Sequence, residues 1–509
     1  MTLLEPHRVG EPVGHCRTAV TVAPDELPAH ADALLGAGFR VASIAGHDDG
    51  EALRAVYLFT AAAPDRRVEL HVPLDPVRPR VPSLAGISFP AGRFEREMRD
   101  LFGIVPDGHP LSRRLVRHFH WPKGWYPMLD DAGDPPAFGD TDGPYPFRSV
   151  EGPGVYEIPV GPVHAGMIEP GHFRFSVVGE TILNLKARLW FVHRGIEKLF
   201  QGRPAAGGLE LAERVSGDTS VGHALAFCQA VEDAQGLIVG EDAQRVRAVL
   251  LELERLYNHV TDLGALCNDV GHGILNAHAQ RIREQLLRLN DHVTGHRLLR
   301  GAIHPGGATI HQLPDLARLR AIAADVAEVV ALALGHSVVR DRFTGTAVLT
   351  RQQALDLGVL GYVARASGLI TDARHDHPVL VSQAARTHAH TAGDVLARFV
   401  VRAEEITASV EIITALVERL DGRLGATEAP AACGTPAAHR SGVGVVEGWR
   451  GTIVHRVELA PDGLLSRVKI VDPSFFNWPA LPVALADTIV PDFPLVNKSF
   501  NLSYAGNDL

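Results

Sequence analysis

The sequence predicts an α+β domain followed by a larger, mainly helical domain that contains a small β-hairpin region. Short apolar stretches rich in β-branched and aromatic residues recur within residues 1–128. Residues 129–150 are dense in Asp, Gly and Pro, which sustain neither helix nor sheet, and they are expected to form a linker. Across residues 151–509 long stretches repeat their apolar residues at the 3.6-residue period of amphipathic helices.

Four strands and two helices are expected in the first domain. The stretches of strand length are residues 18–22, 39–44, 55–59 and 68–72. A helix is expected over residues 25–35, between the first two strands, and another over residues 93–102, ending at Gly103. After Arg93 the second helix carries five further charged residues, a pattern that by itself indicates a solvated face.

The second domain is expected to be a large helical bundle. Its clearest helical patterns lie within residues 246–260, 282–293 and 394–420. Residues 321–339 are the most membrane-like segment, but Asp325, Glu328 and His336 interrupt it. We therefore expect a buried helix of a soluble fold there, not a membrane span.

Composition excludes several classes of protein. A formal charge of −10 and a pI near 6.2, without a basic patch, argue against nucleic-acid binding. The four cysteines form no C-x-x-C pair, so neither a local iron–sulfur cluster nor a zinc knuckle is predicted. Few cysteines and no apolar N-terminal stretch favour a cytoplasmic protein that reaches a membrane only through partners.

Two short segments carry the strongest functional signal. The first is R-V-S-G-D-T, from Arg214 to Thr219, with His223 shortly after it; the second is D-P-S-F-F-N, from Asp472 to Asn477. They resemble the R-x-C-G-x-C and D-P-C-x-x-C metal-binding motifs of nickel–iron hydrogenase large subunits. The positions that match the four cysteines are Ser216, Thr219, Ser474 and Asn477.

These substitutions predict that the nickel–iron centre is missing. The centre needs soft, deprotonated sulfur ligands, two of which bridge the metals, whereas Ser and Thr hydroxyls stay protonated and Asn offers a neutral oxygen. Two interpretations of the four residues remain open. They line a polar pocket for a small ligand, or they fill the former metal volume and hydrogen-bond one another.

The N-terminal part carries a second resemblance. The run F-E-R-E…D-L-F-G-I, from Phe94 to Ile104, followed by His109-Pro110 and Arg113-Arg114, resembles the small hydrophilic subunit of respiratory complex I. Formate hydrogenlyase large subunits carry that module in front of the hydrogenase-like part, which is the order in this chain. The whole sequence therefore resembles formate hydrogenlyase and energy-converting hydrogenase large subunits, which are relatives of the complex I quinone-site subunit.

The hairpin region resembles an active-cavity loop of that family. Gly161-Pro162-Val163-His164 and Gly171-His172 match its G-P-x-H and G-H-x-R stretches, which implies that His172 faces the cavity and that His164 helps to bind a ligand. The alternative is a histidine fixed by turn packing. In complex I a Tyr completes the quinone-binding pair, but Gly217 stands at that position here, so quinone binding is not inherited.

Two further sites follow from the resemblance. Glu197, in the H-R-G-x-E-K run, matches a carboxylate that can hold magnesium in hydrogenases; a salt bridge is the alternative. Arg365 matches a residue of the cavity wall that Asp372 and Arg374 support. The alternative for Arg365 is a structural ion pair between helices.

The resemblance implies a cytoplasmic subunit of an oxidoreductase complex related to NADH-quinone oxidoreductase, peripheral to the inner face of the cell membrane. Electrons would come from a partner iron–sulfur small subunit, beside membrane-arm subunits, because this chain holds no cofactor of its own. A quinone or other small acceptor would lie between His172, Arg365 and the altered motifs, with His223 lining the site and Asp218 or Asp472 donating protons. The alternatives are a non-catalytic scaffold and, less favoured, a hydrogenase with substitute ligands.

Overall fold

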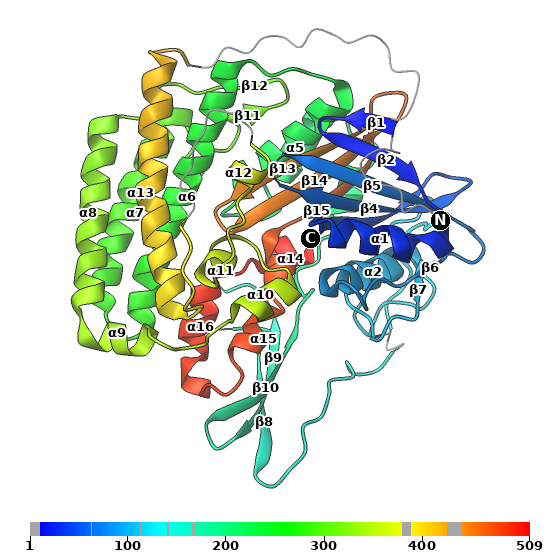
Figure 1. The fold of residues 1–509 in the computed structure, drawn as a ribbon, viewed down its shortest axis with the longest axis horizontal. Coiled ribbons are helices and arrows are strands. Elements are labelled where there is room, and N and C mark those ends of the chain that lie inside the picture. The colour runs from blue at the N-terminus through cyan, green and yellow to red at the C-terminus, as the bar shows by residue number, and fades with distance from the viewer. Residues whose placement is uncertain are drawn as a thin grey trace.

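A computed structural model describes residues 11–62, 64–111, 113–139, 142–164, 168–378, 388–424 and 440–509. Its N-terminal part contains a five-stranded sheet in the order β1-β2-β5-β4-β3, in which β2 and β5 are parallel and the other pairs antiparallel (Figure 1). The strands are β1 (Glu11–Gly14), β2 (Arg17–Thr21), β3 (Arg40–Asp48), β4 (Leu53–Ala61) and β5 (Arg66–Leu74). Each of the four strands expected from the sequence overlaps one of them.

Two helices and a small strand pair complete this part. Helix α1 (Leu27–Gly36) follows the short helix η1 (Pro24–Glu26), and β6 (Arg80–Pro82) pairs with β7 (Val105–Asp107) on either side of α2 (Phe89–Phe102). The side chain of Ser88 caps the start of α2. Gly103 ends it in a left-handed conformation.

The charged face of α2 is buried, contrary to the solvated face that its composition indicates. Arg93, Glu95 and Glu97 are all less than a tenth exposed. Lys469 on a distant strand donates to both oxygens of Glu97, at 2.8 and 2.9 Å, and Phe94 stacks on Phe475 with ring centroids 4.5 Å apart. The helix therefore joins the two parts of the chain.

No helix or strand occurs among the described residues between β7 and β8 (Val155–Val160). Strand β8 pairs with β9 (His172–Val178), which pairs with β10 (Thr181–Arg188), and this sheet projects from the lower edge of the molecule in Figure 1. The loop between β8 and β9 carries His164 of the expected hairpin, and His172 is the first residue of β9.

The helical bundle stands on the other side of the molecule from the N-terminal sheet. Its long members are α6 (Glu241–Asp269), α7 (Gly273–Thr294), α8 (Leu316–Gly335) and α13 (Val395–Leu420), with α13 packed along α6 (Figure 1). Among the described helices, none alone is long and apolar enough to span a membrane, although α8 and α9 (Ser337–Phe343) satisfy that test as a pair bent by 80°.

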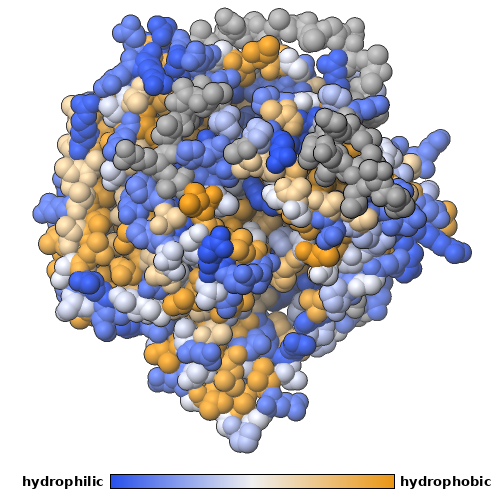
Figure 2. All heavy atoms as spheres, viewed as in Figure 1, coloured by the Kyte–Doolittle hydropathy of each residue, from blue (hydrophilic) through white to orange (hydrophobic). Residues whose placement is uncertain are grey.

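Helix α8 is a surface helix of the bundle and not the buried helix expected from its composition. It buries only one face, which includes Leu319, Val326 and Ala333. Figure 2 shows apolar atoms gathered along the left edge of the molecule, where α8 and α9 stand in Figure 1. Leu332 and Val338, which are 55% and 50% exposed, belong to these two helices.

A second three-stranded sheet in the C-terminal part corrects the expectation of a helical domain with a hairpin region alone. Strands β13 (Arg440–Gly448), β14 (Gly451–Leu459) and β15 (Leu465–Val471) form an antiparallel sheet that packs against α5 (Ser220–Gln235). All nine residues of β14 are buried. A strand covered on both faces loses its polar–apolar alternation, and here buried His455, Arg456 and Glu458 also interrupt the apolar run.

Shorter elements complete the C-terminal part. They are α3 (Ile196–Phe200), α4 (Ala205–Ala212), β11 (Ile303–His304), β12 (Gly307–Ala308), α10 (Arg351–Leu357), α11 (Gly361–Ala366), α12 (Ala373–Asp376), α14 (Pro473–Asn477), α15 (Ala480–Ala484), η2 (Val490–Asp492), α16 (Phe493–Phe500) and α17 (Tyr504–Asp508).

Buried ion pairs join the N-terminal sheet to β14. Glu69 on β5 accepts from Arg17 on β2 at 3.0 Å and from Arg456 on β14 at 3.0 and 3.1 Å. Arg456 also donates to Glu458 at 2.7 Å, and Glu458 accepts from Arg54 on β4 at 2.6 Å. Because such groups are costly to leave unpaired in a dry interior, this network fixes the two parts against each other.

Candidate functional site

Serine hydroxyls connect the two altered motifs. Ser216, in the loop before α5, lies 2.8 Å from the hydroxyl of Ser503, and the backbone N–H of Ser503 donates to the hydroxyl of Ser474 on α14 at 2.9 Å. All three residues are buried. The fold thus brings together the segments that carry the motifs, with the C-terminal segment between them.

Asp218 and Arg450 form the charged centre of the first motif. The guanidinium of Arg450, after β13, donates to both carboxylate oxygens of Asp218 at 2.7 Å. The hydroxyls of Ser216 and Thr219 donate to Oδ1 of the same carboxylate at 3.0 and 2.9 Å. Burial raises the pKa of Asp218, but the pairing with Arg450 outweighs it and the pKa falls to about 2. Asp218 is therefore ionised at neutral pH.

The remaining motif positions are also hydrogen-bonded within the chain. Thr219 accepts from the indole N–H of Trp449 at 3.1 Å and from Arg450 at 3.2 Å. The amide of Asn477 makes a two-point contact with the backbone of Leu360, accepting from its N–H at 2.8 Å and donating to its carbonyl at 3.1 Å. Each of the four residues at the cysteine positions is thus engaged by neighbours, an arrangement closer to a filled volume than to an open pocket.

Asp472, His223 and His455 form a buried chain of polar contacts. Asp472, the N-cap of α14, lies 3.1 Å from Nε2 of His223 on α5, and Nδ1 of His223 lies 3.0 Å from Nε2 of His455 on β14. Burial raises the pKa of Asp472, but the hydrogen bond from His223 leads the effects that lower it below its usual range. Burial holds the pKa of His455 well below its usual range, so that ring is neutral.

Glu254 on α6 is a site residue that the sequence motifs do not mark. It is 1% exposed and accepts the backbone N–H groups of Val221 and Gly222, at the start of α5, at 2.7 and 3.0 Å. Burial raises the pKa of Glu254 to about 8. The sequence predicts that Glu254 lies on the same helix as Glu252 and Tyr257. It does not predict that the Glu254 side chain contacts the start of α5.

The two histidines of the hairpin, His164 in the loop and His172 at the start of β9, have different surroundings. Nε2 of His164 lies 2.8 Å from the carbonyl oxygen of Gly171, across the loop. Nδ1 of His172 lies 3.2 Å from the carbonyl oxygen of Gly161, and its Nε2 is buried with no hydrogen-bond partner in the described part of the chain. The loop also reaches α17, because Glu169 accepts from the N–H of Ala505 at 3.0 Å.

Arg365 lies in a separate ionic cluster between helices and β13. Its side chain is 0% exposed and donates to Glu405 on α13 at 2.8 Å and to Glu447 on β13 at 2.9 Å. Asp372 lies 3.6 Å from it and pairs more closely with Arg374, at 2.7 Å. These are the contacts expected of a structural ion pair between elements.

Glu197 on α3 is paired with two cations of β15. Its carboxylate lies 2.8 Å from Arg467 and 3.1 Å from Lys469, and it accepts the N–H of Ile470 at 3.0 Å. Burial raises the pKa of Glu197, but Arg467 leads the neighbours that lower it to about 2. Two adjacent cations suit a salt bridge and disfavour Mg²⁺ at this carboxylate.

Three family models match parts of the chain. Residues 20–134 match the 30 Kd subunit of respiratory-chain NADH dehydrogenase, residues 194–267 match nickel-dependent hydrogenase, and residues 269–440 match the 49 Kd subunit of respiratory-chain NADH dehydrogenase. The hydrogenase match includes the first altered motif and His223. The second altered motif lies beyond all three matches.

Curated relatives match over most of the chain. Formate hydrogenlyase subunit 5 of Escherichia coli K12 is 32% identical over 87% of this chain and 79% of its own length. Hydrogenase-4 component G of the same organism is 33% identical over 85% and 75%. The fused C/D protein of NADH-quinone oxidoreductase from Phocaeicola vulgatus is 31% identical over 67% and 70%.

A solved structure has a similar fold. A chain of the membrane-bound sulfane sulfur reductase, an archaeal respiratory membrane complex, superposes with a TM-score of 0.63 at 23% identity, over 70% of this chain and 98% of its own. The sequence motifs, the matched family models and the relatives all indicate the same family. The chain belongs to the family of formate hydrogenlyase and nickel–iron hydrogenase large subunits that is related to the fused C/D protein of NADH-quinone oxidoreductase.

Proposed function

We propose that this chain is the large hydrophilic subunit of a membrane-associated oxidoreductase complex, in which electrons from a partner iron–sulfur subunit reach a quinone or another small acceptor. The subunit would lie in the cytoplasm, against membrane-arm subunits at the inner face of the cell membrane. The names of its relatives, which are parts of formate hydrogenlyase, hydrogenase-4 and NADH-quinone oxidoreductase, support that setting. The acceptor site rests on this chain's own residues.

The buried Nε2 of His172 carries the proposal. Its partner nitrogen, Nδ1, faces the Gly161 carbonyl at 3.2 Å, and a carbonyl only accepts, so Nδ1 carries the proton of the neutral ring. Nε2 of that tautomer is an acceptor, and no group among the described residues donates to it. A buried polar atom without a partner is costly, and a hydroxyl group on the reduced form of a small acceptor could donate to Nε2 and satisfy it.

The residues at the cysteine positions do not fit a nickel–iron centre. Their oxygens are neutral, hard donors already committed to hydrogen bonds: Ser216 with Asp218 and Ser503, and Thr219 with Arg450. A bimetallic centre bridged by thiolates needs soft anionic ligands instead. We therefore propose that this chain carries out its reaction without that centre.

Glu254 is a better proton carrier than either aspartate at the altered motifs. The pKa values of Asp218 and Asp472 are both lowered, so these carboxylates hold no proton at neutral pH. Because burial raises the pKa of Glu254 to about 8, that carboxyl keeps a proton at neutral pH and can release it to a stronger base. We propose that Glu254 supplies protons beside the first motif.

A non-catalytic scaffold is the second candidate. It is favoured by the hydrogen bonds that occupy all four substituted positions and by the ion pairs that surround Arg365. In that case the fold would hold partner subunits together and His172 would be only a turn residue.

The two candidates differ in what they predict for the whole complex, purified through a tag on this chain. His172→Asn keeps a side-chain donor for the Gly161 carbonyl but removes Nε2, and His172→Ala removes both nitrogens. If the acceptor binds at His172, both variants should lose at least about tenfold in quinone reduction while recovering the same subunits as wild type. Tyr156→Phe on β8, whose hydroxyl donates to the Gly179 carbonyl at the far turn, is the matched control and should keep its turnover.

Unchanged turnover in both His172 variants would contradict the redox role and favour the non-catalytic scaffold. Recovery of the tagged chain without any iron–sulfur or membrane subunit would contradict the proposal that the chain belongs to a membrane-associated complex.

A further inference from the structure

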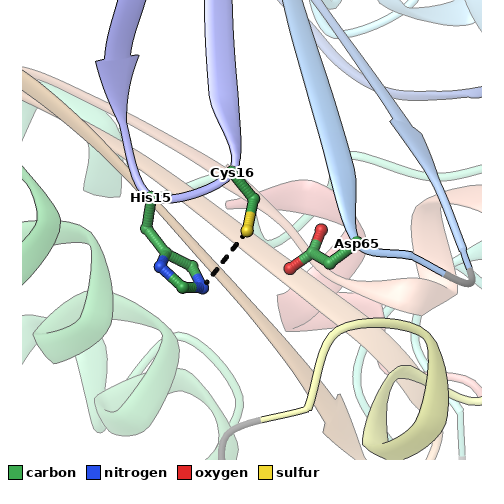
Figure 3. Close-up of side chains that lie close together, drawn as sticks. All are labelled: His15, Cys16 and Asp65. Carbon is green, nitrogen blue, oxygen red and sulfur yellow. Dashed lines mark hydrogen bonds between the residues drawn. The ribbon is translucent and has the colours of Figure 1, made fainter.

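Three potential metal ligands meet at the junction between the N-terminal sheet and the rest of the chain. His15 and Cys16 form the turn between β1 and β2, and Asp65 precedes β5. Their ligand atoms all lie within 4.8 Å of one another, and Nε2 of His15 is 3.6 Å from Sγ of Cys16. Figure 3 shows the sulfur between the imidazole and the carboxylate.

We propose that these three side chains bind a zinc ion through Nε2 of His15, Sγ of Cys16 and Oδ2 of Asp65. An imidazole, a thiolate and a carboxylate are the three ligand types that Zn²⁺ takes in proteins. The two anionic ligands balance the charge of a divalent cation. This site is separate from the altered hydrogenase motifs, and its role does not depend on the reaction proposed above.

The hydrogen bonds of Asp65 leave one position for a metal. Its Oδ1 lies 2.7 Å from Nδ1 of His377 and accepts from Nε of Arg67 at 3.2 Å, which uses both lone pairs of that oxygen. Oδ2 accepts only from Nη2 of Arg67, at 2.8 Å, among the described residues. The second lone pair of Oδ2 is the one left for the cation.

Neighbouring groups fix the orientation of Asp65 and His15, as hydrogen-bonded neighbours of metal ligands do in metalloproteins. His377, buried at 3% exposure, and Arg67 fix the orientation of the Asp65 carboxylate. Asp233 on α5 accepts the backbone N–H of His15 at 2.7 Å and so holds the turn in place. Cys16 itself has a φ of +51°, a conformation that is unfavourable for a residue with a side chain and is maintained by this setting.

Nearby charges do not oppose a cation. Arg67 pairs with Asp65, and the next guanidinium, of Arg17, pairs with Asp233 at 3.2 Å and with Glu69. The positive charges that approach the site are therefore each matched by a carboxylate. Zinc bound to a deprotonated Cys16 would not meet an unpaired guanidinium among these neighbours.

The fourth coordination position would open onto a cavity. A cavity of about 830 Å³ is lined by the three ligands and by residues of α5 and β13, including Asp233 and Val443. Three protein ligands with an open position resemble a site for exchangeable ligands and not a closed structural site. Because His377 comes from the C-terminal part, a metal here would also stiffen the contact between the two parts.

Cobalt titration of the full-length chain, treated first with a chelator, tests the site. Co²⁺ replaces Zn²⁺ in such sites and gives a thiolate-to-metal absorption band in the near ultraviolet. Wild type should bind one equivalent with that band, and added Zn²⁺ should remove it. Cys16→Ser should abolish the band, and His15→Ala should weaken binding by about tenfold or more.

Matched variants separate this site from adventitious binding. Cys228→Ser and Cys267→Ser remove buried thiols, and His278→Ala removes an exposed imidazole on α7; all three should bind like wild type. Zn²⁺ should also slow maleimide labelling of Cys16 in wild type but not in His15→Ala. A band that survives Cys16→Ser, equal affinity in His15→Ala, or no thiolate band at all would overturn the proposal.

Discussion

Arg450, between β13 and β14, donates to both carboxylate oxygens of Asp218 at 2.7 Å, and Asp218 lies in the first altered motif. The same guanidinium donates to Thr219 at 3.2 Å and to the carbonyl oxygen of Asn501 at 2.6 Å. One cation thus organises the first altered motif and ties it to the C-terminal segment. An ion pair and hydroxyls therefore occupy the loop that resembles the R-x-C-G-x-C motif.

Arg450→Met should destabilise the protein by about 1–3 kcal/mol. The substitution leaves Asp218 charged without its guanidinium partner and removes the donor of Thr219 and of the Asn501 carbonyl, although Trp449 still donates to Thr219. Water reaches Asp218, whose side chain is 39% exposed, and this moderates the loss. Urea unfolding at neutral pH measures the change in the free energy of unfolding.

The neighbouring pair of Arg214 and Glu210 is the control for Arg450. Their side chains are 47% and 75% exposed, so Glu210→Ala should cost less than about 0.5 kcal/mol. Equal effects of the two substitutions would show that Arg450 has no special part in organising the loop.

Glu254→Gln should remove a pH dependence of stability between about pH 4.5 and 8. Burial raises the pKa of Glu254 from 4.5 to about 8, so in this window the folded state keeps a proton that the unfolded state releases. The contribution to stability is fully present below pH 4.5 and is lost as the pH rises through 8, with a slope of at most about 1.4 kcal/mol per pH unit.

The measurement is the difference in unfolding free energy between wild type and Glu254→Gln at several pH values. Relative to wild type, the variant should gain stability from pH 5 to pH 8. Glu180→Gln, at an exposed residue, should show the same pH dependence of the unfolding free energy as wild type. A constant difference between wild type and Glu254→Gln would show that Glu254 is ionised throughout.

The local elements and the altered motifs were predictable from the sequence, whereas their partners were not. Strand β4 and helix α13 carry their patterns within one contiguous segment, and the two motifs are short enough to be matched residue by residue. Arg450 lies more than 200 residues from Asp218, and the local sequence around either residue does not predict their contact. Sheet β13–β15 escaped prediction because burial of both faces removes the alternation that marks a strand.

Glu69→Ala should weaken the contact between the N-terminal sheet and β14. Glu69 is 0% exposed and accepts from Arg17 and Arg456, so its removal leaves two buried guanidinium groups without this partner, a loss of about 3–5 kcal/mol. Differential scanning calorimetry should show one cooperative transition for wild type and a broadened or split transition for Glu69→Ala. Glu51→Ala, at an exposed residue before β4, should leave it unchanged; a similar effect in both variants would argue against the network.

Metal analysis of the purified complex should find nickel well below one equivalent per chain, because Ser216 and Ser474 offer only protonated hydroxyls. Ser216→Ala and Ser474→Ala distinguish a true site from contamination. Traces of nickel bound elsewhere should persist in both variants, whereas nickel held at the altered motifs should fall in both. Stoichiometric nickel that disappears on either substitution would establish that oxygen donors do hold a metal there, and the hydrogen bonds with Asp218 and Ser503 would then need to rearrange to release those oxygens.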